Sequence, residues 1–316
     1  MQKFSIIILI WCTCFQFSFA QDSNFKLPMD SIEHVLKNQS FELRAMHGAR
    51  FPEDVAKKGI LVSEDKTFFM VKAKGAVPGG EEFNNSPRFE VAAYELQKLF
   101  LDPHEYVVPP TVCRSFPLEL FRLKVNKDTK ETFRKTKSVL FVVQYWMENV
   151  TQQDVFDEGR LKTDSLYARH MANLNIFTYL ILHNDANKGN VLISTDETNP
   201  RAFAVDNGVA FGADESARGT EWREIRTQRL PKKTVDRLRE ITKEDLENQL
   251  SVLAQFEIRD KQLVEVPLTE VLDIKYGVRK KKDKVQLGLT DWEIEDLHKR
   301  LTFFLKQVDK GEFELY

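Results

Sequence analysis

The chain has 316 residues, of which 42% are hydrophobic and 30% charged, and its formal net charge is −2 at pH 7. This length and hydrophobic content allow two connected domains, each with a real core. Because basic and acidic residues nearly balance, the composition gives no reason to expect nucleic acid as a partner.

The segment 1–20 has the pattern of a cleavable secretory signal. Lys3 is its only cation, an apolar run follows at 4–15, and the segment ends in the residues SFA, with Ala20 last. The run is too short for a comfortable membrane span, and no later segment approaches the required length. We therefore expect no transmembrane segment and a mature chain that is secreted or periplasmic.

Residues 59–74 predict a β-hairpin. An apolar run leads to a turn at 63–66, and the β-prone segment 67–71 follows. Lys72 stands at the end of the predicted second strand, and Lys74 shares its face. Lysines at strand ends are usually just solvated, so a functional role for either one requires an acidic partner.

Such a partner is available in a helix predicted over residues 88–102. Its apolar residues repeat at helical spacing. Glu90 lies at the start of this helix, beside the apolar face, and is placed to pair with Lys72. Glu95 lies beside the opposite edge of that face, and periodicity alone does not separate the two glutamates. The apolar positions are Phe89, Ala92, Ala93, Leu96, Leu99 and Phe100.

The middle of the chain predicts a buried strand followed by a long helix. The strand covers 138–145, and residues 146–149 after it suit a hinge against an adenine ring, although a core strand with a plain loop would look the same. The helix is capped by Asp164 and runs to Leu182, directly before His183.

The helix leads into the most informative motif, H-x-D-x-x-x-x-N followed by two short strands and D-x-G. Its residues are His183, Asp185, Asn190, Asp206 and Gly208. The pattern is that of the catalytic and metal-binding segments of protein-kinase-like enzymes. The alternative is an ordinary polar loop, because Asn, Asp and Gly are common turn residues. The two strand-forming runs are 191–193 and 202–205.

The chemistry of phosphoryl transfer explains this spacing. ATP is strongly anionic, so transfer of its terminal phosphoryl depends on positioning and on metal ions that neutralise charge. Asn190 and Asp206 offer the oxygen ligands that Mg²⁺ or Mn²⁺ would take. Asp185 is then available to orient or deprotonate the acceptor hydroxyl. We interpret His183 as a residue that pins the loop, since a zinc site would need a second histidine pair that the sequence lacks.

Together these segments resemble the secreted kinase-like family that includes the Golgi casein kinase. The resemblance rests on FEVAAYELQKLFLDPHEYVVPPTV, with its E-x-A-A-Y-x-L helix and VPP turn, and on VDNGVAFG at 205–212. It implies Lys72 and Glu90 as the phosphate-holding pair, Asp206 as a metal ligand and Asp185 as the catalytic aspartate.

The chain also departs from that family. The NDANKGN loop is more similar to the loop of phosphoinositide kinases and antibiotic phosphotransferases, which leaves the acceptor open. No G-x-G-x-x-G precedes the first strand, and only Gly48 could form a tight loop over phosphates. Cys113 is the single cysteine beyond the signal, so an intramolecular disulfide is impossible. This differs from the disulfide-braced animal kinases and favours a bacterial envelope or secreted protein.

The C-terminal third predicts helices. One covers roughly 232–241, and the last begins at a capping box made by Thr290 and Glu293. The basic cluster 279–284 suits a solvated loop better than a binding patch, although an anionic acceptor or lipid head group could use it. Three arginines lie where kinases receive acceptor or regulatory phosphate, and we assign none of them. They are Arg218, Arg223 and Arg226.

We therefore predict an α+β, two-lobed, protein-kinase-like fold, with a signal peptide at 1–20, a small sheet-rich lobe at 21–144 and a larger, mainly helical lobe at 145–316. The predicted function is an ATP-dependent phosphotransferase, a kinase that uses Mg²⁺ or Mn²⁺ and transfers the γ-phosphoryl to a hydroxyl of a protein, sugar or lipid. Two alternatives keep the fold: a nucleotide-binding pseudokinase that regulates a partner, and an enzyme that transfers the nucleotidyl group.

Overall fold

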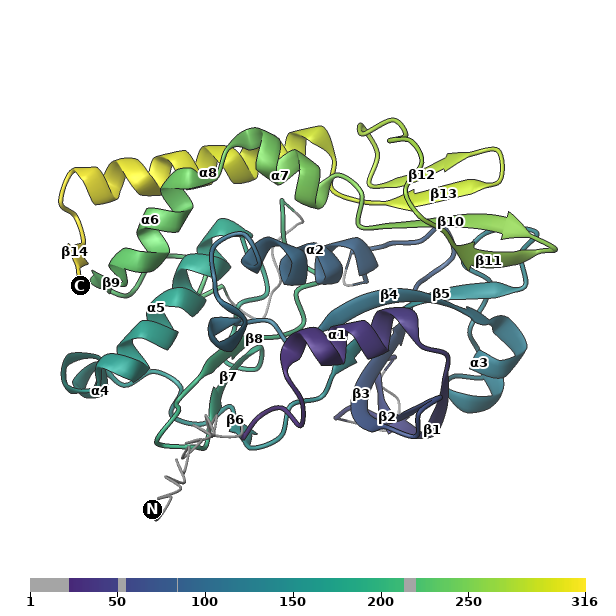
Figure 1. Cartoon of the computed structure of the whole chain (residues 1–316), viewed down its shortest axis with the longest axis horizontal. Coiled ribbons are helices and arrows are strands. Elements are labelled where there is room, and N and C mark those ends of the chain that lie inside the picture. Colours follow the sequence, from purple (N-terminus) through teal and green to yellow (C-terminus); the bar gives the residue numbers. More distant parts are fainter. Residues whose placement is uncertain (1–22, 51–54, 84, 213–219) are drawn as a thin grey trace, which may run out of the picture.

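The computed structural model describes residues 23–50, 55–83, 85–212 and 220–316. The predicted signal peptide and Arg218 lie outside the described residues. The described chain has a mixed α+β fold (Figure 1), with the two larger sheets toward one end of the molecule and the helices α4 to α6 at the other.

The first sheet has five antiparallel strands in the order β1-β2-β3-β5-β4. The predicted hairpin is confirmed as β2 and β3, and the predicted buried strand as β5, every residue of which is buried. Lys72 is not at a strand end, because β3 continues to Gly75. The extra residues stay extended because they pair with β5, where Lys72 lies opposite Gln144. The strands are β1 (Phe41–Gly48), β2 (Lys57–Ser63), β3 (Phe68–Gly75), β4 (Thr111–Pro117) and β5 (Ser138–Tyr145).

Helix α2 is shorter than the sequence predicts, covering Pro87–Gln97 instead of 88–102. Beyond it the chain continues in tight turns, in which Leu99 and Phe100 donate to carbonyls three residues back. Phe100 therefore stays in the core although the α-helix has ended. The other helical segments of this half are α1 (Met29–Asn38), the 3-10 turn η1 (Pro103–Glu105) and α3 (Leu118–Lys124).

The second half contains the predicted long helix, α5 (Ser165–Leu180). Its cap is confirmed, because the Asp164 carboxylate accepts hydrogen bonds from the backbone N–H groups of Leu166 and Tyr167. The capping box at the start of α8 is confirmed as well. The remaining elements are β6 (Val150–Thr151), α4 (Glu158–Thr163), β7 (Val191–Ser194), β8 (Ala202–Ala204), β9 (Arg229–Leu230), α6 (Lys232–Glu240), α7 (Lys243–Leu250), α8 (Asp291–Asp309) and β14 (Glu314–Leu315).

A four-stranded sheet, β11-β10-β13-β12, interrupts this helical half, and the sequence did not predict it. The basic cluster is part of it: it forms most of the β12–β13 hairpin, with Lys282 at positive φ in the turn. The prediction that this cluster forms a loop is therefore wrong. The strands are short and rich in charge, which hides their alternation, while their buried residues pack on Cys113 and Leu140 of the first sheet. The strands are β10 (Ala254–Arg259), β11 (Gln262–Glu265), β12 (Val278–Lys281) and β13 (Lys284–Leu287).

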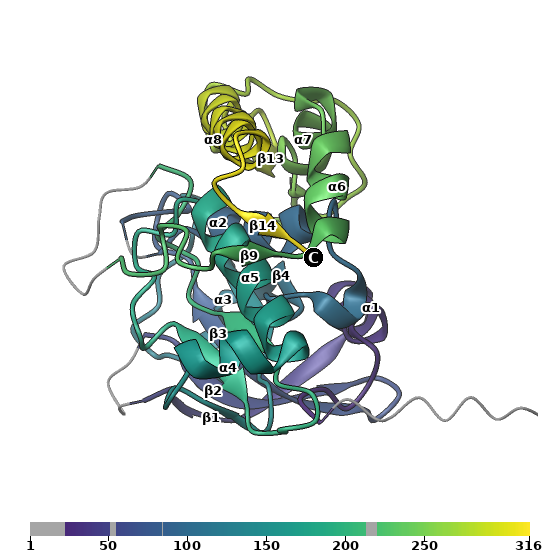
Figure 2. The same cartoon turned by 90° about the vertical axis from the view of Figure 1, so that its left-hand side faces the viewer.

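The packing of these elements fixes the position of α2. In both views α2 lies between the first sheet on one side and α7 and α8 on the other (Figures 1 and 2). The main core runs through all of these elements. Among the described residues, no helix is long and apolar enough to cross a membrane.

Candidate functional site

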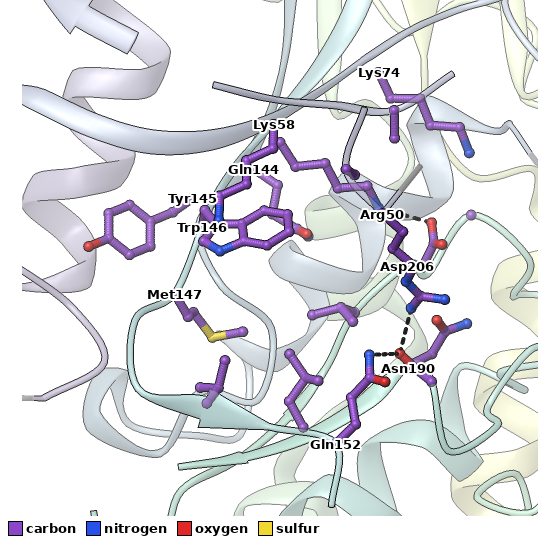
Figure 3. A pocket seen from close by; sticks show the side chains of 18 of the residues that line it. Arg50, Lys58, Lys74, Gln144, Tyr145, Trp146, Met147, Gln152, Asn190 and Asp206 are labelled. Atoms are coloured by element: carbon purple, nitrogen blue, oxygen red, sulfur yellow. Dashed lines mark hydrogen bonds and ion pairs between the residues drawn. The ribbon is translucent and has the colours of Figure 1, made fainter. Parts of the chain in front are cut away.

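A cavity of about 1240 Å³ lies beside the inner face of the first sheet. Residues of β2, β3 and β5 line one side of it, and the loops at 185–192 and 205–209 line the other. Figure 3 shows Trp146 and Met147 at one end, and Arg50, Asn190 and Asp206 together at the other. Four of the five site residues predicted from the sequence line this cavity: Lys72, Asp185, Asn190 and Asp206.

Lys72 and Asp206 form an ion pair across this cavity. The Lys72 Nζ lies 3.0 Å from Asp206 Oδ1, and the two side chains are 16% and 38% exposed. The Lys72 ammonium holds the pKa of Asp206 well below its usual range, although burial opposes this. Burial also disfavours the charge on Lys72, but attraction to Asp206 and Glu90 outweighs it and raises the pKa of Lys72. Both groups are therefore charged at neutral pH.

The backbone at Asp206 is strained. Asp206 has a φ of 60°, in the left-handed region, and only Val205 separates it from the end of the short strand β8. A non-glycine residue held in this region costs on the order of 1–3 kcal/mol and persists only where its surroundings enforce it. Backbone bonds on both sides do so here: Val205 N–H donates to the Asn190 carbonyl, and Asn207 N–H donates to Glu90.

Glu90, and not Glu95, faces the site. The Glu90 side chain is buried, and its Oε2 accepts the Asn207 N–H at 3.0 Å. Burial raises the pKa of Glu90, against the opposing attraction of Lys72. Glu95 instead bonds Lys98 and Gln249 on the other side of α2. The structure thus separates two residues that helical periodicity could not. The predicted pairing of Glu90 with Lys72 is not a direct contact, because the Lys72 ammonium bonds Asp206 and Glu90 acts on it only through its charge.

The loop after α5 holds Asp185 in place. One of its carboxylate oxygens accepts a hydrogen bond from Asn187 Nδ2, and the other accepts one from Asn190 Nδ2, both at 2.8 Å. Asn190 Nδ2 also donates to the Asp185 carbonyl at 2.9 Å. The amide nitrogen of Asn190 is thus engaged, which leaves its amide oxygen as the atom suited to a cation.

His183 makes the contact that a loop-pinning role predicts. It is fully buried, and its Nδ1 accepts the backbone N–H of Asp185 at 3.3 Å. Burial lowers the pKa of His183, which keeps the ring neutral, as an acceptor nitrogen requires.

The segment after β5 lines the far end of the cavity, where the sequence places a hinge. Trp146 N–H donates to the Met70 carbonyl on β3 at 2.9 Å. The Lys58 Nζ lies 4.2 Å from the centre of the Trp146 ring, within cation–π range. Trp146, Met147 and Met70 give this end of the cavity apolar and aromatic surface.

Sequence reasoning missed Arg50, Lys58 and Gln152, which also line the cavity. The Arg50 guanidinium and the Gln152 amide both donate to the Gly189 carbonyl, at 2.9 and 3.1 Å. Arg50 thus connects the segment after β1 to the loop that carries Asp185. No periodic signal marks it. Gly48, the one glycine that could have formed a tight loop over phosphates, ends β1 and pairs with Lys57. Residues 51–54 after it lie outside the described residues.

A second cavity of about 510 Å³ adjoins the first, since Gln152 and Gln153 line both. It lies beside Lys188 of the Asp185 loop. Arg226 stands over the rings of Phe156 and Trp222, at 4.6 and 5.0 Å from their centres. Of the arginines that the sequence left unassigned, Arg226 lies here. The walls of the second cavity therefore combine aromatic surface with charged groups. Lys188 and Arg226 are basic, and Asp154 and Glu221 are acidic.

A lysine on a strand, an H-x-D-x-x-x-x-N loop and a D-x-G segment thus line one cavity, with a buried glutamate of α2 behind it. The overall fold of the chain is similar to the folds of two solved structures, both of atypical kinase-like proteins. The structure of hydra Fam20 with sugar has a TM-score of 0.52 and 15% identity, over 89% of this chain and 88% of that one. A crystal structure of the Golgi casein kinase has a TM-score of 0.51 and 14% identity, over 89% and 75%.

These likenesses confirm the predicted resemblance at the level of the fold. At such identities they do not carry residue roles or substrates to this chain. No protein-family model and no curated protein sequence matches the chain.

Proposed function

We propose that this protein is an ATP-dependent phosphotransferase that transfers the γ-phosphoryl group of ATP to a hydroxyl acceptor. One observation carries the proposal: the Lys72–Asp206 ion pair and the Asp185–Asn190 pair line one cavity large enough for a nucleotide, and the buried Glu90 supports the backbone behind Asp206. These residues lie far apart in the sequence, and a purely structural role does not explain why they meet beside a cavity. The kinase-like fold supports the same reading.

Each residue has a distinct role in this proposal. Lys72 holds the phosphates, and Glu90 holds the backbone after Asp206 in place and attracts Lys72 through its charge. Asp185 receives or orients the proton of the acceptor hydroxyl, because its carboxylate is fixed by two amides at the edge of the cavity. Arg50 adds a cation where a glycine-rich loop would otherwise bind phosphates. Trp146 and Met147 provide the apolar surface for the adenine ring.

The residues fit a divalent cation. Asp206 offers an ionised carboxylate, and Asn190 offers an amide oxygen, which are the hard oxygen ligands that Mg²⁺ or Mn²⁺ prefers. When bound, the cation would neutralise charge on the phosphates. The strained left-handed backbone at Asp206 would then serve function, because it orients the Asp206 carboxylate toward the cation.

We infer that the acceptor enters through the second cavity. It adjoins the nucleotide cavity beside the Asp185 loop and combines aromatic walls with polar side chains, which suits a polar acceptor with an apolar face. A sugar has this character, and the hydra Fam20 structure was solved with sugar. A protein or lipid hydroxyl remains the alternative acceptor.

Three further parts of the proposal rest on sequence. We infer a sheet-rich lobe to residue 144 and a larger lobe after it, a signal peptide at 1–20, and a secreted or periplasmic location. A pseudokinase and a nucleotidyl transferase are the competing functions. The retained site residues favour an enzyme over a pseudokinase.

Labelled ATP separates these functions. The mature protein is incubated with Mg²⁺ or Mn²⁺, envelope extract and either γ-labelled or α-labelled ATP. A phosphotransferase passes only the γ label to an acceptor, and a nucleotidyl transferase passes the α label. Metal-dependent binding without transfer of either label would establish the pseudokinase, and absence of binding would reject a nucleotide site altogether.

A further inference from the structure

The first turn of α2 is bound to the first turn of α8, 205 residues further along the chain. The Arg88 guanidinium makes two hydrogen bonds to the Glu293 carboxylate, Nη1 to Oε2 at 2.5 Å and Nη2 to Oε1 at 2.9 Å. Arg88 Nε also bonds Glu81 at 2.5 Å. The side chains of Arg88 and Glu293 are only 9% and 2% exposed, so this is a buried, bidentate ion pair.

The surroundings hold this pair rigidly. Glu293 Oε2 also accepts the Thr290 N–H at 2.8 Å, which places the carboxylate within the capping box of α8. On the other side, a Cβ on Gly277 would lie 2.2 Å from Arg88 Nε, so only glycine leaves room for the guanidinium. Arg88 therefore has little freedom to move without breaking the contact.

The same turn of α8 also touches the end of the D-x-G segment. Gly212 has a φ of +98°, and a Cβ there would lie 2.9 Å from the Trp292 ring. Next to this contact, the rings of Phe89 and Phe211 lie 5.6 Å apart. The start of α8 thus contacts both the helix that carries Glu90 and the segment that carries Asp206.

Stability alone does not account for such a pair. Two charges taken out of water lose about as much solvation as they gain by attraction, and an apolar pair of similar size is often as stable. What a bidentate pair does supply is a fixed distance and orientation between two helices. Glu90 lies two residues after Arg88 in the same turn of α2, so a shift of that turn would move Glu90 away from Asn207 N–H and from Lys72.

We propose that Arg88 and Glu293 are positioning residues: the start of α8 holds α2 so that Glu90 meets the backbone after Asp206 and keeps its charge near Lys72. The C-terminal helix is then part of the site's support, although none of its residues lines the described cavity. The inference rests on the proposed function only for the role of Glu90, since the contacts themselves do not depend on any activity.

The test uses Glu293→Gln, which removes the charge but keeps an oxygen for the cap, and Arg88→Met, which keeps most of the side-chain length. The control is Arg239→Met, which breaks an exposed ion pair to Asp309 at the far end of α8. Hydrogen exchange of the Asn207 N–H is measured in the full mature chain without ligand, together with global unfolding in urea.

We expect the Asn207 N–H to exchange roughly tenfold faster or more in Glu293→Gln and Arg88→Met, with wild-type exchange in the control. Metal-dependent ATP affinity should fall in the same two variants. Wild-type exchange at Asn207 in a folded Glu293→Gln protein would overturn the proposal. If Arg88→Met does not fold, Glu293→Gln decides alone. If the wild type binds no ATP, the proposed function fails, while the exchange result still tests the positioning role.

Discussion

Single residues in the cavity gain their properties from charge and burial together. Lys72, Glu90 and Asp206 are one cation and two carboxylates, so the group carries a net negative charge when all three are ionised. Lys72 holds Asp206 ionised, whereas burial disfavours the charge on Glu90. A bound metal and the phosphates of ATP would rearrange these contacts, because Lys72 would then have a phosphate within reach.

The two lysines of β3 should differ in their contribution to phosphoryl transfer. Met70, Lys72 and Lys74 share the cavity face of the strand, but the ion pair to Asp206 belongs to Lys72. We expect Lys72→Met to reduce turnover by two or more orders of magnitude, with Lys74→Met closer to wild type. Turnover of γ-labelled ATP measures both, and circular dichroism checks the fold. Full activity in Lys72→Met with loss in Lys74→Met would reverse the assignment.

Asp185 should separate binding from chemistry. Its carboxylate is held by Asn187 and Asn190, and the proposed function assigns it to the acceptor hydroxyl and not to the nucleotide. We expect Asp185→Asn to keep ATP affinity within a few-fold while transfer falls about 10²–10⁴-fold, as expected when a positioned proton acceptor is removed. Calorimetry gives the affinity and labelled ATP gives the transfer. Equal losses in both would show that Asp185 acts through binding alone.

Glu90 should make stability depend on pH. Burial raises its pKa in the folded chain above the ordinary value of about 4.3, so the folded state holds this proton more tightly than the unfolded chain does. Stability from this group is therefore present below about pH 4 and is lost as pH rises through the folded pKa.

Glu90→Gln removes this titration and keeps an acceptor for Asn207 N–H. We expect the variant to gain stability relative to wild type as pH rises above about 4.3, while it loses ATP affinity. Urea unfolding at several pH values measures the difference. A constant difference across the range would mean that Glu90 titrates normally.

At the scale of elements, short polar contacts join helices and loops that sequence patterns treat separately. Gln97, the last residue of α2, is fully buried, and its side chain binds the chain at the start of the VPP segment (108–110) to the end of the helix. Its Oε1 accepts the N–H groups of Val107 and Val108, and its Nε2 donates to the Val108 carbonyl. A single side chain thus satisfies three buried backbone groups.

Replacing Gln97 should therefore be costly. We expect Gln97→Leu to destabilise the protein by about 3 kcal/mol or more, because each buried polar group left unsatisfied costs about 1–3 kcal/mol. Urea unfolding measures the loss. The neighbouring Lys98→Ala, which removes partly exposed ion pairs to Glu33 and Glu95, should cost about 1 kcal/mol or less. Equal effects of the two changes would contradict this account.

At the scale of the whole molecule, residues from both halves of the chain line the larger cavity, where we propose that ATP binds. A ligand that binds only the folded state stabilises it by about 2.7 kcal/mol at a hundred times its Kd. We expect ATP with Mg²⁺ or Mn²⁺ to raise the melting temperature by several degrees, and chelation with EDTA to remove most of the shift. Asp206→Asn should lose the metal-dependent part. A shift that is unchanged by EDTA and by Asp206→Asn would exclude a metal site at this position.

The sequence by itself determined many of the elements and the order of the site residues. Local patterns predict the β2–β3 hairpin, the buried strand β5, the capped helices α5 and α8, and the strand pair β7–β8 that precedes Asp206. Hydrophobic periodicity and capping are properties of neighbouring residues, so a single sequence carries them. The kinase-like fold followed from the order of these elements.

Only the tertiary structure decided which of several equivalent residues face the site. Glu90 and Glu95 lie on opposite sides of one helix, and their surroundings, not their spacing, distinguish them. Arg50 lines the cavity, but it lies in a segment that has no hydrophobic periodicity. The β10–β13 sheet forms because it packs on β4 and β5. Arg88 meets Glu293 across 205 residues. These contacts join distant segments, and local sequence patterns contain no information about such pairings.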